Sequence, residues 1–158
     1  MYLYGNHKIL TPTKPMTVFS TWIAKGESPI TVMSSDFSTT EITLHNLGIG
    51  FDHCVIQLHS LGHITVSPDT LILMLDTRMP KSDPIWVPAS SIKPASAIMM
   101  AVVQPNNSLL PVMVRRTFFG PKQDYYSYGV VGDGSPAMIA MSKGCVMFMP
   151  EKKHVRSS

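Results

Sequence analysis

The sequence predicts an all-β protein, built as a single jelly-roll-like β-sandwich domain. Short β-branched and aromatic runs recur every ~8–12 residues with Gly, Pro, Asn, Asp or Ser between them. Helical periodicity is hard to find, and 13 prolines are spread through the 158 residues. Roughly 8–10 strands in one domain match a two-sheet jelly roll better than a small barrel.

The chain has the length of one domain, which we divide into three parts. Residues 1–15 lack alternation and contain Pro12 and Pro15, so we expect a surface arm. Residues 16–150 form the β-sandwich. Residues 151–158 form a short basic tail.

The strands are expected where β-branched and apolar residues gather between turn residues. They are placed at 16–24, 29–34, 40–46, 52–60, 70–77, 98–103, 109–119, 125–131, 136–141 and 144–149. Two hairpin turns are predicted, at Gly132-Asp133-Gly134 and at Ser142-Lys143-Gly144. Residues 79–97 hold four prolines and form one long connection. The expected core includes the mid-strand residues Val55, Ile72, Leu73, Leu75, Val112 and Val114.

Cysteine usage and hydropathy indicate an intracellular protein that does not span a membrane. Cys54 and Cys145 are too few for a disulfide framework, and no secretory signal opens the chain. The mean hydropathy of +0.13 is high, yet no window approaches the ~18 apolar residues of a membrane span. Any membrane contact is therefore expected to be peripheral, and the net charge of +3 is compatible with nucleic acid.

No enzyme motif is present. The sequence lacks a G-x-S-x-G nucleophile elbow, phosphate loops, dinucleotide fingerprints and H-E-x-x-H helices, so we expect no catalytic activity and no cofactor. His53, His59 and His63 with Cys54 raise the question of zinc. Along a strand, however, Cys54 and His53 point to opposite faces, so no metal site is expected.

Cations and aromatic rings alternate in one segment near the C-terminal third. Arg115 and Arg116 precede two phenylalanines, and Lys122, Tyr125 and Tyr126 follow. Binders of single-stranded nucleic acid use this mixture, because cations contact phosphates and rings stack on bases. Alternating aromatics are also ordinary sandwich core, which is the alternative reading.

Asp76 stands with Arg78 at the end of the most hydrophobic strand. A carboxylate there is costly unless it is paired or accepts backbone N–H groups. We expect it to fix the 79–97 connection through loop amides or Arg78, in preference to acting as a catalytic acid.

These residues resemble plant-virus movement proteins of the thirty-kilodalton superfamily, in which a hydrophobic strand ends in an aspartate followed by a basic residue and methionine. Asp76-Thr77-Arg78-Met79 has that pattern. Phe51 to Ile56 is similar to the corresponding strand of bipartite geminivirus movement proteins. Of the family's functional residues, only the signature aspartate carries over, to Asp76.

The resemblance implies a viral cell-to-cell movement protein. It implies binding of single-stranded RNA or DNA without sequence preference, self-association, contact with host plasmodesmal proteins, and location in host cytoplasm and plasmodesmata. The alternative is a jelly-roll capsid subunit of a small virus. Capsid subunits usually carry a basic arm, whereas residues 1–24 contain only Lys8 and Lys14.

Overall fold

The computed structural model describes residues 1–36, 38–59, 62–79, 81–101, 108–120 and 126–152, and these form a strand-rich fold with one short α-helix. The all-β class is therefore confirmed. The strands are β1 (Tyr2–Tyr4), β2 (Lys8–Leu10), β3 (Pro15–Thr17), β4 (Ile30–Met33), β5 (Thr39–Gly48), β6 (His53–Leu58), β7 (Gly62–Val66), β8 (Leu71–Asp76), β9 (Ile85–Pro88), β10 (Ser96–Ala101), β11 (Leu109–Gly120), β12 (Ser127–Gly132), β13 (Ala137–Met141), β14 (Gly144–Met149) and β15 (Glu151–Lys152). The helices are α1 (Val18–Lys25) and the 3₁₀ turn η1 (Ala89–Ser91).

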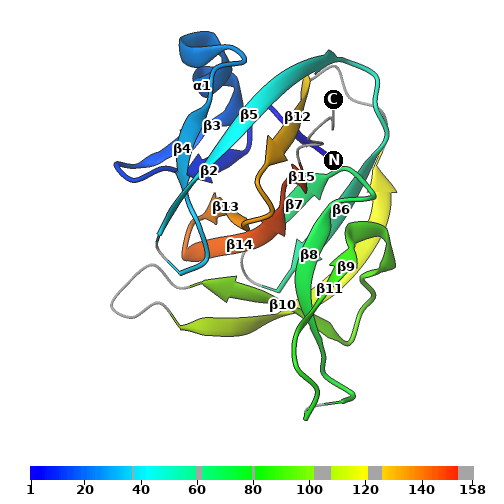
Figure 1. The fold of residues 1–158 in the computed structure, drawn as a ribbon. Coiled ribbons are helices and arrows are strands. Elements are labelled where there is room, and N and C mark those ends of the chain that lie inside the picture. Colours follow the sequence, from blue (N-terminus) through cyan, green and yellow to red (C-terminus); the bar gives the residue numbers. More distant parts are fainter. Residues whose placement is uncertain (37, 60–61, 80, 102–107, 121–125, 153–158) are drawn as a thin grey trace, which may run out of the picture.

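One continuous, curled sheet runs through the molecule (Figure 1). Its strand order is β3-β2-β13-β14-β8-β10-β11-β6-β7-β1-β12-β5-β4, with β9 beside β8 and β15 beside β12. The expected pair of separate jelly-roll sheets is not what this order shows. The reason is β11, whose first part pairs with β10 and whose second part pairs with β6 across a register shift between Val114 and Arg116. A bulge bends a strand, so one strand serves both halves of the sheet.

Helix α1 replaces the strand expected at 16–24. Thr17 caps the helix, because its Oγ1 accepts from Ser20 N at 3.1 Å. Gly26, at a positive φ of 57°, ends it and donates to Trp22 O at 2.8 Å. β-branched and aromatic residues favour strands in isolation, but here the helix buries Val18 and packs the Trp22 ring at a tilt against Tyr128 in β12.

The first fifteen residues lie within the sheet, and the expected surface arm is wrong. β1 pairs with both β12 and β7, and β2 pairs with β13. Leu3 and Ile9 are buried in the core. The expectation failed because three-residue strands are too short to show alternation.

The core runs along the concave side of the sheet as one apolar cluster that joins residues from β1 to β14. Ile72 and Val114 are buried in it, and Val55 is buried outside it, so all three are buried as expected. Leu73, Leu75 and Val112 are only partly buried. The apolar run of β8 therefore has two different faces, with Ile72 and Met74 inside.

Of the two predicted hairpin turns, one joins paired strands and the other does not. The Ser142-Lys143 hairpin is confirmed, since β13 and β14 pair from Ala137 to Phe148. The Gly132–Gly134 turn instead carries the chain away from β12, which pairs with β1, β5 and β15. Besides β1 and β2, three strands were not predicted: β7, β9 within the proline-rich connection, and β15 in the expected tail.

Candidate functional site

The start of the chain is held against the turn between β7 and β8. This turn spans Ser67 to Thr70, with Thr70 N donating to Ser67 O at 3.0 Å. Tyr2 N donates to Ser67 Oγ at 2.9 Å, and Ser67 N donates to Tyr2 O at 3.1 Å. Ser67 Oγ also lies 2.7 Å from Thr70 Oγ1, and both hydroxyl residues are buried. The first peptide units of the chain are therefore fixed by a buried hydroxyl pair.

Charged groups from the first residue, from the Ser67–Thr70 turn and from β15 meet beside this hydroxyl pair. The nitrogen of Met1 lies 3.5 Å from Asp69 Oδ2 and 3.3 Å from Glu151 Oε2. Burial acts to raise the pKa of Asp69, but the hydrogen bond from Ser67 and the nearby amino group outweigh it and lower the pKa. Figure 1 shows the N-terminal end beside β15, the strand that carries Glu151. We call Met1, Tyr2, Ser67, Asp69, Thr70 and Glu151 the junction cluster.

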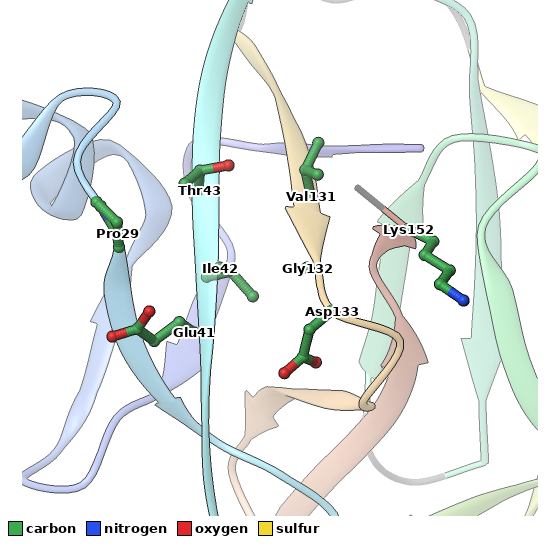
Figure 2. A pocket seen from close by; sticks show the side chains of 8 residues that line it. All are labelled: Pro29, Glu41, Ile42, Thr43, Val131, Gly132, Asp133 and Lys152. Carbon is green, nitrogen blue, oxygen red and sulfur yellow. The ribbon is translucent and has the colours of Figure 1, made fainter. Parts of the chain in front are cut away.

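A pocket of about 330 Å³ opens beside Lys152, the residue after Glu151. Figure 2 shows its lining: Pro29, Glu41, Ile42, Thr43, Val131, Gly132, Asp133 and Lys152. Asp133 is fixed, because its Oδ1 accepts from Ser135 N at 3.0 Å and from Thr40 Oγ1 at 3.1 Å. These hydrogen bonds lower the pKa of Asp133, and the bond from the Ser135 backbone has the largest effect. Two carboxylates thus stand on the rim of an apolar hollow near the junction cluster.

Of the residues predicted to bind nucleic acid, only some are seen to lie together. Arg115 and Arg116 lie side by side and exposed on β11. Lys122 and Tyr125 lie outside the described residues. Tyr126 is half exposed, and its carbonyl oxygen accepts from Gly5 N at 3.1 Å. Among the described residues, no hydrogen bond or ring contact joins Tyr126 to the two arginines.

Asp76 binds its near neighbour. Its Oδ1 accepts from the backbone N and the Nε of Arg78 at 3.0 and 3.1 Å, and its Oδ2 accepts from the guanidinium at 3.1 Å. The Arg78 hydrogen bonds lower the pKa of the carboxyl group. Arg78 is the expected partner. The carboxylate makes no described bond to residues 81–97, so the expected link through loop amides is not seen there.

The histidines considered as zinc ligands point in different directions. His53 is buried with Nδ1 at 2.7 Å from Tyr4 Oη, whereas His59 and His63 are exposed. Within the described part of the chain, no three potential metal-ligating side chains gather. No described helix is long and apolar enough to cross a bilayer.

Comparison with solved structures places the chain among inteins in fold. It is similar to the TvoVMA intein, with a TM-score of 0.73 and 14% identity, covering 93% of this chain and 96% of that one. It is also similar to a DnaB intein from Synechocystis sp. PCC 6803, with a TM-score of 0.63, 8% identity, and coverage of 92% and 96%. The transcription factor IIB Mvu mini-intein gives 0.66, 8%, and coverage of 92% and 98%. No protein-family model and no curated protein matches the sequence.

These similarities overturn the viral interpretation. The structural neighbours are inteins, which are protein-splicing domains, and none of those found is a movement protein. The fold therefore points away from a movement protein at plasmodesmata and from a capsid subunit. The Asp76 motif was too short to carry a family assignment, because a hydrophobic strand ending in Asp-x-Arg also arises where the acid simply pairs with its neighbour.

Sequence reasoning missed the junction cluster altogether. Its residues come from the first two positions, the Ser67–Thr70 turn and Glu151, and no spacing rule connects them. The one available signal was Ser67-Pro68-Asp69, a turn sequence between two apolar runs. That signal indicates a turn and says nothing about what the turn contacts.

Proposed function

We propose that this chain is an intein-fold domain that holds the two points where polypeptide joins it close together, and that it does so without splicing. The observation that carries the proposal is the nitrogen of Met1 between Asp69 and Glu151, at 3.5 and 3.3 Å. Residues 150 positions apart thus meet at one place. Domains whose ends are adjacent tolerate insertion into a longer chain.

The chemistry of the junction cluster supports the non-splicing part of the proposal. Breaking a peptide bond needs an activated nucleophile and a group to transfer protons. The cluster offers the hydroxyls of Ser67 and Thr70, and within the described residues no histidine or cysteine hydrogen-bonds to either. The carboxylate in the cluster, Asp69, accepts a hydrogen bond from the Ser67 side chain, which acts to lower its pKa and makes it a weak base for a hydroxyl whether or not the Met1 nitrogen is joined to further polypeptide.

The two cysteines are no better placed for attack. Cys54 and Cys145 are both buried, and burial raises the pKa of the Cys145 thiol to about 11. A thiol is a poor nucleophile when it is protonated and shielded from its target.

A tripartite fusion tests the proposal. The domain is placed between two fluorescent proteins, and the products are measured by electrophoresis, mass spectrometry and energy transfer between the fluorophores. We expect one intact polypeptide with high energy transfer that is lost in denaturant. A ligated product lacking the domain would refute the absence of splicing, and an intact fusion with transfer no higher than in denaturant would refute the holding of the ends.

A second candidate function is self-cleavage of the Met1–Tyr2 peptide bond: Ser67 Oγ would attack the carbonyl carbon of Met1, the Tyr2 nitrogen would leave with the hydroxyl proton, and water would hydrolyse the ester. The observation that favours it is that Ser67 Oγ, which accepts from Tyr2 N at 2.9 Å, lies beside this bond. The same fusion separates it from the first. Cleavage between the first fluorophore and the domain, abolished in Ser67→Ala and retained in Ser135→Ala, would establish this candidate.

A further inference from the structure

A row of polar side chains crosses three strands on the outer face of the sheet, on β7, β6 and β11. His63 pairs in register with Gln57, and Gln57 pairs with Arg116. Residues in register on neighbouring strands lie side by side on the same face. Arg116 Nε donates to Gln57 Oε1 at 2.6 Å, so the guanidinium is held in the row.

The register shift in β11 adds Arg115 to this row. The pairing passes from Val114 directly to Arg116, which leaves Arg115 as the extra residue. A bulge of this kind redirects a side chain. Arg115 lines a pocket of about 280 Å³ together with Gln57, Leu58, Gly62 and His63. Two arginines, an amide and an imidazole therefore border one hollow.

Neither arginine is neutralised by a carboxylate among the described residues, and both are exposed. The guanidinium carbon of Arg116 lies 4.6 Å from the centre of the Phe118 ring, which supports it from one side. A guanidinium has five N–H donors, and the bond to Gln57 uses only the one on Nε. The outer fork of Arg116 is pre-oriented and binds no other described residue, so it can bind an anion at a lower entropic cost.

We propose that Arg115, Arg116, Gln57 and His63 form a phosphate-binding site for the backbone of a single-stranded nucleic acid. Arginine forks match the geometry of phosphate oxygens, and imidazole and amide N–H groups complete the donor set. Phe118, two residues beyond Arg116 and on the same face of β11, is only partly buried and adds an aromatic ring beside the guanidinium, next to which a base can pack. The site belongs to this surface and is separate from the junction cluster.

The test is fluorescence anisotropy of a labelled oligothymidylate at a series of salt concentrations. Arg115→Ala/Arg116→Ala should weaken binding about tenfold or more at low salt, and should reduce the log–log salt slope by about 1.4, since two phosphate contacts are lost. The matched control is Lys25→Ala/Lys143→Ala, which removes the same charge from two other exposed positions. It should retain the wild-type slope. Equal losses in both double variants would overturn the proposal, as would binding that ignores salt.

Two further variants separate the site from general positive charge. Arg115→Lys/Arg116→Lys keeps the charge but loses the planar fork, so affinity should fall while the salt slope stays. Gln57→Leu removes the amide oxygen that holds Arg116, so affinity should again fall while the salt slope stays. Wild-type affinity in both would show that only charge matters and would overturn the site. Inorganic phosphate should displace the oligonucleotide, but inorganic phosphate that binds as tightly as the oligonucleotide would overturn the assignment to a strand. Thermal melts check that each variant is folded.

Discussion

Tyr4 Oη lies 2.7 Å from Nδ1 of His53, and this buried contact joins residues 49 positions apart. The other ring nitrogen, Nε2 of His53, is buried and has no described hydrogen-bond partner. The contact therefore provides the ring with its hydrogen bond and ties β1 to β6.

Tyr4→Phe should lower the free energy of unfolding by about 1–3 kcal/mol, because it leaves the buried ring without its remaining partner. Denaturant unfolding measures the change. Tyr126→Phe is the matched control, since Tyr126 is half exposed, and it should cost little. A Tyr4→Phe variant as stable as wild type would contradict the role given to this contact.

Gly120→Ala should destabilise the fold by at least about 1–3 kcal/mol, the usual cost of overpacking. A Cβ atom at Gly120 would overlap Nε2 of His53 and lie 2.7 and 2.8 Å from the neighbouring ring carbons. Gly129→Ala is the control in another strand, because its Cβ would make only ordinary contacts, the nearest at 3.7 Å. If the ring is the obstacle, the added cost of Gly120→Ala should largely vanish in a His53→Ala background.

The melting temperature should be level between about pH 7 and 8 and fall as the pH drops below about 6.5. Burial lowers the pKa values of both His7 and His53 in the folded protein. In the unfolded chain these groups take up protons first, so acid favours unfolding. His7→Gln and His53→Gln should each reduce the steepness of the fall, measured by calorimetry across pH. A melting temperature that stays level to about pH 5 would contradict this account.

Both thiols should react slowly with a thiol-modifying reagent in the folded protein and fully in denaturant. Burial raises the pKa values of Cys54 and Cys145, the second to about 11. Because the thiolate is the reactive form, the folded protein holds little of it. Mass spectrometry of timed samples measures the labelling. Rapid labelling of either cysteine under native conditions would show that it is accessible.

Asp76→Asn should scarcely change the melting temperature. The carboxylate is bound to Arg78, which is largely exposed, and exposed ion pairs contribute little. The measured shift should be clearly smaller than that of Tyr4→Phe, and Arg78→Ala should behave as Asp76→Asn does. If Asp76→Asn strongly lowered the melting temperature and Arg78→Ala did not, the carboxylate would have to hold the 79–97 connection through contacts other than its pair with Arg78.

The sequence alone determined the all-β class, nine of its strands, and the Ser142-Lys143 hairpin. These features depend on neighbours in the chain. Val55, Ile72 and Val114 were expected to be buried because they stand in the middle of apolar runs, and they are buried; a two-residue turn joins β13 to β14. Local side-chain preferences are strong enough to specify such features.

Tertiary structure decided the rest. The run from Val18 to Lys25 has strand-forming residues, yet Thr17 caps it and burial of Val18 makes it a helix. Ser67 and Asp69 become part of a site only because β1 lies beside the turn that carries them. Contacts between residues far apart in the chain depend on which strands close the sheet. Periodicity within a strand carries no information about its partners, because the pattern of alternating faces is the same whichever strand lies beside it.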